Sequence, residues 1–462
     1  MAQVLVSVKN LTNIANAIRN KTQSQKSYKP PQMASAINDI PDKNITNAII
    51  EKYKALQEPV DAFTFVEVIN KINVDDEETI GLYYNAKAIA LSSSQLIVLH
   101  AKDSTNNQLY ALSCSISNNQ ISADYDTSIS TTNNTARTFD GSAISDNSIF
   151  VAYDAGDGTL VAQVCTFTSS GIMSGTIYGG AIASYSNYVS VTALSRTKVF
   201  ISYGSDNTNY YLMGIVCSVG DSSISRGTAV TLSNVSYSAY DSKSVTLTDS
   251  KVFVMHSSGG RFGGAINGIV CTISGTVITV GTDTTLYNQV EISSGSTCDA
   301  LSDTKVIIAH QWESTTYLAG TVCTINGAAI TTGANTLLVP ENYTGSSISV
   351  AALSDSKVFI AHSSSGGNSY LNGLSCTISG TKISPGADTT LSNSVYSSFY
   401  ARVVKVNSNQ AFITHSYGSS GTALVGTLCT PETVIKKATT KIGGITKEAC
   451  GSAYAGDVWI LE

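Results

Sequence analysis

Cysteine and histidine are the side chains in this 462-residue chain that could bind a metal ion or supply a nucleophile with its base. Such chemistry needs several of them to converge on one point, so their spacing decides the interpretation. Seven of the nine cysteines recur at intervals of 51 to 54 residues: Cys114, Cys165, Cys217, Cys271, Cys323, Cys376 and Cys429. The regular interval indicates an internal repeat rather than a ligand cluster.

The repeat spacing argues against both disulfides and a metal site. Equivalent strand positions in neighbouring repeats should lie on the order of 10 Å apart, which is beyond the reach of a disulfide bond. We therefore expect the repeated cysteines to be small buried core residues. Cys298 and Cys450 fall outside the pattern, nothing marks either as a nucleophile, and both are expected to be structural. The sequence predicts no metal site and no cofactor.

The histidines follow the same repeat. In five repeats a histidine stands at the end of the second apolar segment, and in the other two repeats Tyr153 and Tyr203 stand at the same position. The five histidines are His100, His256, His310, His362 and His415. Rotation about a ring axis would spread these side chains apart, so they could not meet as catalytic or metal-binding residues. We expect each ring to pack between repeats and to find a polar partner at the strand end.

Acidic residues give two further candidates. Three aspartates recur between the first and second apolar segments of their repeats: Asp249, Asp303 and Asp355. We expect a tight turn there, because an Asp side chain can form a hydrogen bond with its own backbone in a turn. The run of Asp75, Asp76, Glu77 and Glu78 could coordinate a cation, because hard ions take several oxygens. Alternation along a strand would divide these side chains between two faces, which favours a solvated charged strand that discourages edge pairing.

The repeat itself must supply the elements that position these residues. Two near copies of the unit read LSDTKVIIAH…LAGTVCTINGAAITTGANTLLV and LSDSKVFIAH…LNGLSCTISGTKISPGADTTLS. Every unit divides into four short apolar segments separated by Gly, Ser, Asn and Asp, which predicts four strands and leaves no room for a helix. A period of about 50 residues with four strands is typical of a β-propeller blade or a β-solenoid.

The two ends of the repeat array decide between these architectures. The fourth segment is missing after Cys429, where the sequence reads TPETVIKK, and a matching segment precedes the first repeat at 70–81, with Ile72 and Ile80 in register. A ring must join its ends, and pairing a leading strand with the last blade removes two exposed sheet edges. We therefore predict an all-β fold, a seven-bladed β-propeller closed by an N-terminal strand.

One face of this propeller is a candidate binding surface. If the strands alternate in direction, the loops between second and third strands and the connections to the next blade emerge on the same face. These variable segments mix Tyr with Ser and Asn, a usual surface for recognition of saccharides or proteins. The candidate ligand-binding residues are Trp312, Tyr185, Tyr188, Tyr210, Tyr240, Tyr343, Tyr396 and Tyr400. The alternative is that many of these tyrosines pack the blade edges.

Charge and hydropathy limit the partners. The net charge of −6 and the pI near 5.4 provide no basic field for a nucleic acid or an anionic membrane. No apolar run is long enough to span a bilayer, and the start MAQVLVSVKN lacks the apolar region of a secretory signal. We expect synthesis in a cytoplasm, no nucleic-acid partner and no membrane insertion.

Short extensions flank the predicted ring. Four apolar residues near the N-terminus share one helical stripe: Leu11, Ile14, Ala15 and Ile18. Helices this small do not form a stable domain alone, so they are expected to pack on a partner or on the ring. The expected division is a helical attachment segment at 1–60, the propeller at 61–430, and a C-terminal extension or small β module at 431–462.

These extensions resemble segments of known proteins. LTNIANAIRNKTQSQKSYKPPQMASAINDI resembles the N-terminal segment of many virion and tail-associated proteins of phages and prophages infecting Firmicutes. The closing ATTKIGGITKEACGSAYAGDVWILE resembles a short C-terminal module of phage structural proteins. The resemblance implies a phage or tailocin protein, assembled in the host cytoplasm and exposed on tail or capsid, with residues 1–60 contacting other virion proteins. It transfers no ligand site, because the matching motifs are attachment segments.

Three functions are compatible with these sequence features. The leading hypothesis is a virion receptor-binding or host-adhesion protein that binds a host-surface glycan or protein. The alternative is a capsid decoration or head-fibre protein. The third, an envelope-degrading hydrolase, is disfavoured because the sequence shows no paired acid and base, so we do not expect an enzyme.

Overall fold

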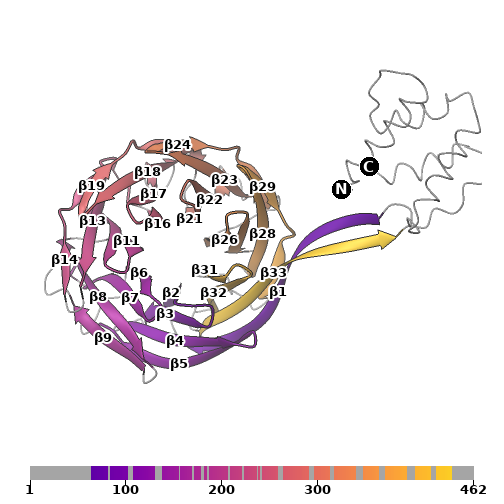
Figure 1. The fold of residues 1–462 in the computed structure, drawn as a ribbon, viewed down its shortest axis with the longest axis horizontal. Helices are drawn as coiled ribbons and strands as arrows, with labels where there is room; N and C mark the ends of the chain where they lie inside the picture. Colours follow the sequence, from indigo (N-terminus) through magenta and orange to yellow (C-terminus); the bar gives the residue numbers. More distant parts are fainter. Residues whose placement is uncertain are drawn as a thin grey trace, which may run out of the picture. The chain divides into compact units, whose positions relative to one another are not determined.

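The repeats fold into seven antiparallel sheets that surround a central axis (Figure 1). The computed structural model describes residues 64–439 except 82–83, 102–107, 131–137, 156, 169–170, 178–181, 185–186, 206–208, 221–222, 237, 240–241, 259–263, 291–295, 313–316, 340–346, 364–369, 393–400 and 418–422. Asn70–Glu432 form one compact unit. Each sheet is one blade, so the predicted seven-bladed all-β propeller is confirmed. The expected N-terminal helices, and most of the expected C-terminal module, lie outside the described residues.

Each blade is built from strands stacked outward from the axis. The innermost strands are β2 (Tyr84–Ala90), β6 (Phe139–Ser145), β11 (Asn187–Ser195), β16 (Lys243–Thr248), β21 (Ser296–Ser302), β26 (Ile348–Ser354) and β31 (Arg402–Asn407). The second strands are β3 (Gln95–Ala101), β7 (Ser148–Asp154), β12 (Lys198–Ser205), β17 (Lys251–Ser258), β22 (Lys305–Trp312), β27 (Lys357–Ser363) and β32 (Gln410–Tyr417). The third strands are β4 (Leu109–Ser117), β8 (Thr159–Thr168), β13 (Tyr211–Val219), β18 (Gly264–Ser274), β23 (Tyr317–Asn326), β28 (Leu371–Ser379) and β33 (Ala423–Thr439).

The outer strand is divided in five blades, which differs from the single segment expected. The outer strands are β5 (Gln120–Ser128), β9 (Gly171–Ile177) with β10 (Ala183–Ser184), β14 (Ile224–Arg226) with β15 (Val230–Ser233), β19 (Val277–Val280) with β20 (Thr284–Val290), β24 (Ala329–Thr332) with β25 (Thr336–Val339), β29 (Lys382–Pro385) with β30 (Thr389–Ser392), and β1 (Thr64–Gly81). At the break between β19 and β20, the Gly281 N–H donates to the Val270 carbonyl at 3.0 Å. A Cβ at Gly281 would lie 2.5 Å from that oxygen, so the break requires glycine.

The last blade combines the two ends of the repeat array. Its strand order is β1, β33, β32, β31, so the strand ahead of the first repeat supplies the missing outer strand (Figure 1). Ile72 and Ile80 of β1 are buried, as their register predicted. The Thr430 hydroxyl of β33 also donates to the Asp75 carboxylate of β1. The predicted closure by an N-terminal strand is confirmed.

Apolar side chains fill the spaces between adjacent blades. Seven buried clusters each combine residues from two neighbouring blades, including one between the last blade and the first. One position of the second strand carries a fully buried phenylalanine in five blades: Phe150, Phe200, Phe253, Phe359 and Phe412. The seven repeated cysteines and Cys298 are free and buried, which confirms their predicted place in the core. Cys450 lies outside the described residues.

The innermost strands are linked from blade to blade by side chains. Their inner edges carry backbone N–H groups that no further strand can pair. Asp140 accepts a hydrogen bond from the Val191 N–H at 2.8 Å, and Asp299 accepts one from the Ala352 N–H at 2.8 Å. Three serine hydroxyls accept from the next blade in the same way: Ser142 from Ala193, Ser190 from Ser244 and Ser349 from Val403. Polar residues around the axis therefore help to close the ring.

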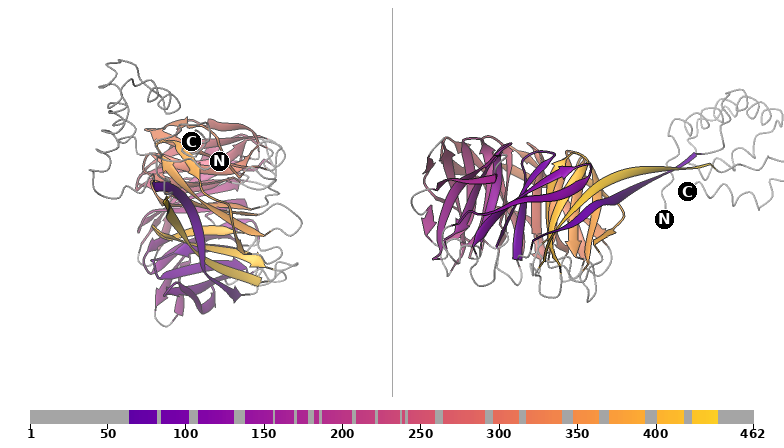
Figure 2. Two further views of the ribbon diagram at one scale, coloured as in Figure 1. Left: turned by 90° about the vertical axis from the view of Figure 1, so that its right-hand side faces the viewer. Right: turned by 90° about the horizontal axis from the view of Figure 1, so that it is seen from below.

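The strands run between the two faces of the ring (Figure 2). Because consecutive strands of a blade are antiparallel, the second-to-third connections and the connections to the next blade open on one face, which we call the loop face. The tight first-to-second turns occupy the opposite face, and Asp249, Asp303 and Asp355 are exposed there, as predicted. Within the described part of the chain, no helix is long and apolar enough to cross a bilayer.

Candidate functional site

The candidate ligand-binding residues lie at strand ends on the loop face wherever the structure describes them. Tyr188 is the second residue of β11, Tyr210 directly precedes β13, and Trp312 ends β22. The other candidates lie outside the described residues: Tyr185, Tyr240, Tyr343, Tyr396 and Tyr400. Their grouping into one binding surface stays a prediction.

Tyr188 and Tyr210 are brought together. Their ring centroids are 6.2 Å apart with an interplanar angle of 79°, an edge-to-face contact. Both side chains are half-buried and pack against the apolar cluster between the third and fourth blades. Each backbone carbonyl is also held, since Ser242 Oγ donates to Tyr188 O at 3.2 Å and the Ala239 N–H donates to Tyr210 O at 3.0 Å. The pair is a fixed aromatic platform with one side supported by the core.

The backbone at these two tyrosines is unusual. Tyr188 has φ of 56° and Tyr210 has φ of 48°, both in the left-handed region. The other described non-glycine residues with positive φ, Asn118 and Asn119, form a hairpin turn, where Asn is a usual choice. A bulky residue in this region costs about 1–3 kcal/mol and is found most often at functional sites. The strain at both members of one aromatic pair marks this corner of the loop face as a candidate site.

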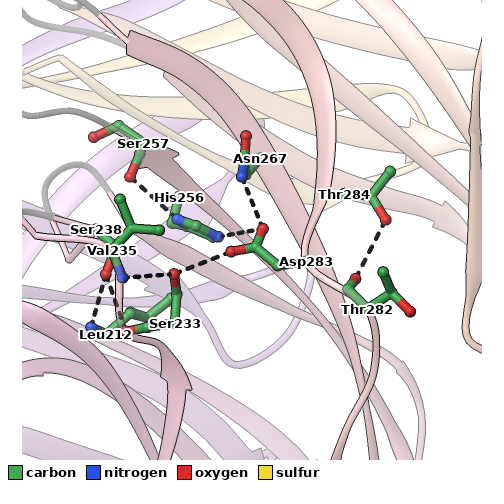
Figure 3. Close-up of polar contacts among 10 residues, drawn as sticks. All are labelled: Leu212, Ser233, Val235, Ser238, His256, Ser257, Asn267, Thr282, Asp283 and Thr284. Carbon is green, nitrogen blue, oxygen red and sulfur yellow. Dashed lines mark hydrogen bonds and ion pairs between the residues drawn. The ribbon is translucent and has the colours of Figure 1, made fainter.

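The histidines brace the blades instead of forming a catalytic centre. His256 Nδ1 lies 3.1 Å from the Ser257 carbonyl oxygen and Nε2 lies 3.0 Å from Asp283 Oδ1 (Figure 3). Asp283 also accepts from Asn267 Nδ2 at 2.9 Å and from Ser233 Oγ of the preceding blade at 3.0 Å. Both nitrogens of the His256 ring are engaged by acceptors, so neither faces a substrate.

The same brace recurs around the ring. In four blades the imidazole Nε2 meets a polar residue, which lies in outer strand β5 for the first blade and in the break of the divided outer strand for the other three: Asp126 for His100, Asp283 for His256, Asn335 for His310 and Asp388 for His362. His415 instead meets the Thr427 hydroxyl at 2.8 Å. His310 also packs at 4.6 Å against Tyr287 of the preceding blade. All five imidazoles are buried and have a polar partner, as predicted, and His310 also shows the predicted packing against a neighbouring blade.

The partners of the histidines were missed in the sequence. Asp283, Asn335 and Asp388 each lie two residues after the glycine of the divided outer strand, in VGTDTTL, TGANTLL and PGADTTL. A polar residue that recurs two residues after this glycine, 25 to 27 residues after the repeated histidine, was the available signal. The strand break bends the backbone so that this residue turns towards the second strand.

Burial and hydrogen bonding set the ionisation of these groups. Burial alone would raise the pKa of Asp283 and Asp388, but the hydrogen bond and charge of the histidine, with the Asn bond, hold each pKa below its usual value. Burial lowers the pKa of His310, whose partner is an uncharged amide. Burial raises the pKa of five repeated thiols to about 12, so these stay protonated and unreactive at neutral pH: Cys114, Cys217, Cys271, Cys323 and Cys376. Within the described residues, no cluster of His, Cys, Asp and Glu could hold a metal ion.

These shifts predict an acid-dependent loss of stability. A carboxyl whose pKa is lower in the folded state stabilises the fold above its unfolded pKa, near 3.8, and loses this contribution as the pH falls through the folded value. Asp388→Asn is therefore expected to lower the free energy of unfolding at pH 7 by about 1–2 kcal/mol and to flatten its decline below about pH 4. Urea denaturation at several pH values measures both effects. Asp355→Asn, at an exposed turn of the same blade, is the control and should leave the wild-type pH profile unchanged.

Comparison with protein-family models finds no match, and comparison with curated proteins finds none either. Among solved structures, the BP39L lectin from Burkholderia pseudomallei gives a TM-score of 0.55 at 9% identity, covering 76% of this chain and 99% of that one. The ulvan lyase of polysaccharide lyase family PL25 gives 0.48 at 9% identity, covering 76% and 95%. The Aleuria aurantia lectin AAL gives 0.42 at 12% identity, covering 68% and 98%. At such identities the likeness concerns the fold alone, so the class that fold and sequence define is that of β-propeller proteins.

Proposed function

We propose that this chain is a glycan-binding protein exposed on the surface of a phage or phage-tail-like particle, where its loop face binds host-surface saccharides. The observation that carries the proposal is the Tyr188 and Tyr210 pair, held rigid, half-buried and backbone-strained at the loop face. Aromatic rings fixed in this way can stack on a sugar ring at little entropic cost. The Burkholderia protein that shares this fold is a lectin, which supports the same assignment.

The particle context is supported by the terminal segments. The N-terminal and C-terminal stretches resemble attachment segments of phage structural proteins, and residues 1–60 would contact the particle. In this assignment the chain acts by binding and not by catalysis. Immunogold labelling of intact particles tests its location: labelling at the tail tip supports host adhesion, whereas labelling restricted to the capsid supports the alternative of a decoration or head-fibre protein.

Glycan binding is tested on the aromatic pair. The wild-type chain is expected to bind host cell-wall glycans on an array or in a pull-down, and Tyr188→Ala and Tyr210→Ala should each weaken the Kd by about tenfold or more, because each removes a central aromatic contact. Trp312→Ala tests whether the site extends to the fifth blade. Tyr125→Ala, on an exposed residue of outer strand β5, is the matched control and should bind as wild type does. Absence of binding by the wild type, or equal binding by all variants, would contradict the proposal.

A further inference from the structure

The central channel carries a charge opposite to that of the whole molecule. It is a cavity of about 500 Å³ lined by residues from all seven innermost strands. Four cationic side chains line it: Lys87, Lys243, Arg402 and Lys405. The carboxylates beside them are Asp299, in the lining, and Asp140, which pairs with Lys87. Four cations against two carboxylates leave a formal charge of +2, whereas the whole chain has a net charge of −6.

Strand register places three of the cations at one level of the ring. Lys87, Lys243 and Arg402 pair with Leu99, Met255 and Thr414 of the second strand. Each of those partners directly precedes the repeated histidine of its blade. At the same level the other blades carry Asp140, Ser190, Thr297 and Ser349, so a ring of seven polar side chains surrounds the axis. Lys405 lies three residues further along β31.

The two carboxylates already have partners. Asp140 accepts from Lys87 and from the Val191 N–H, and Asp299 accepts from the backbone N–H groups of Ala300 and Ala352, both at 2.8 Å. Within the described residues, neither Lys243 nor Lys405 forms an ion pair with a carboxylate, and Arg402 donates to the Ala401 carbonyl at 3.0 Å. Lys243 and Lys405 act on the Asp299 carboxylate through their charges without a direct ion pair, and the formal excess over the described lining remains +2.

The cations also act on one another. Burial, together with the charges of Lys243 and Arg402, lowers the pKa of Lys87 to about 8, although Asp140 raises it. Like charges that line one channel repel each other unless an anion lies between them, and a concave wall concentrates their field. A bound anion would reduce the repulsion between these cations and so stabilise the folded chain.

We propose that the central channel is an anion site that binds a phosphate group, with Lys243, Arg402 and Lys405 as its ligands. A phosphate near neutral pH carries up to two negative charges, which match the formal excess of +2. Guanidinium and ammonium groups are the usual protein ligands of phosphate, and the Thr297 hydroxyl at the same level adds a neutral donor. The cavity is larger than one phosphate ion, so the group can be free or attached to a larger molecule. This site is separate from the aromatic pair and does not depend on the proposed glycan binding.

The proposal is tested with the full-length chain by isothermal titration with inorganic phosphate and with glycerol 3-phosphate, in a phosphate-free buffer at pH 7 and low ionic strength. Saturable binding of phosphate is expected, and Lys243→Met and Lys405→Met should each weaken it by about tenfold, since each removes one charged contact. Lys405 is exposed, so its substitution should leave the fold intact, and circular dichroism verifies this. Lys382→Met, at an exposed lysine of outer strand β29, is the control and should bind as wild type does.

The two probes separate the sources of the ligand. Binding of inorganic phosphate alone supports a free ion as ligand, and binding of both probes supports a phosphate carried on a larger molecule. Three results would overturn the proposal: no saturable binding by the wild type, the same heat from sodium chloride at matched ionic strength, or unchanged affinity in both lysine variants.

Discussion

Ile80→Asp is expected to release strand β1 from the last blade and to lower the free energy of unfolding by at least about 4 kcal/mol. Ile80 is 7% exposed and packs in the cluster between the last and first blades, with Phe412 and Leu424 on one side and Leu96 on the other. The substitution removes this apolar contact and places a carboxylate among apolar side chains. Because whole domains are stable by only about 5–15 kcal/mol, the loss should be visible in any denaturation curve.

The consequence of this release is a bare edge on β33. Such an edge can pair with another chain, so we expect oligomers on size-exclusion chromatography and fast amide exchange along both β1 and β33. Val74→Asp is the matched control, because Val74 lies in the same strand but is 40% exposed. It should change the stability by less than about 0.5 kcal/mol. Equal stability of the two variants would show that β1 does not hold the ring closed.

The closure of the ring was predictable because the repeat pattern continues in the segment that precedes the first repeat. The segment at 70–81 shares the apolar register of the fourth strand, and only a ring gives a reason for one unit to be split between the two ends. The buried cysteines and the inter-blade histidines were predictable for the same reason, since a residue type that recurs at one position in most blades has one structural role. The partners of the histidines were missed because the glycine break that turns Asp283 and Asp388 inward changes the alternation of a strand.

The channel was not predictable from the repeat. Its charged residues occur at one level of the innermost strand, but the seven blades fill that level with Lys, Asp, Ser, Lys, Thr, Ser and Arg. No single blade carries a motif, and the site exists only when the ring brings the seven positions together. The positions of the loop-face residues were also not predictable, because their segments vary in length and composition between blades and so have no common register. Of these, the pairing of Tyr188 with Tyr210 depends on backbone conformations that the sequence does not show.

Asp140→Ala is expected to lower the free energy of unfolding by about 3–5 kcal/mol, the usual cost of removing one partner from a buried ion pair. The Asp140 side chain is 4% exposed and that of Lys87 is 22% exposed. The substitution leaves the Lys87 ammonium without its partner and the Val191 N–H without its acceptor. Ser142→Ala is the control, because Ser142 lies in the same strand as Asp140 and is only a neutral acceptor for the Ala193 N–H of the next blade. It should lower the free energy of unfolding by about 1 kcal/mol.

The double variant Lys87→Met with Asp140→Leu separates the charge from the packing. It should recover most of the loss, because a buried ion pair replaced by apolar side chains of similar size is often neutral for stability. It should also change the pH dependence. The folded-state pKa of Lys87, about 8, lies below its ordinary 10.5, so the unfolded chain binds more protons between these values and the wild-type contribution of this group rises with pH across that window. Urea denaturation from pH 7 to 10.5 should show this rise in the wild type and its absence in the double variant. An identical slope in both would mean that the Lys87 ammonium is as well stabilised in the channel as in water.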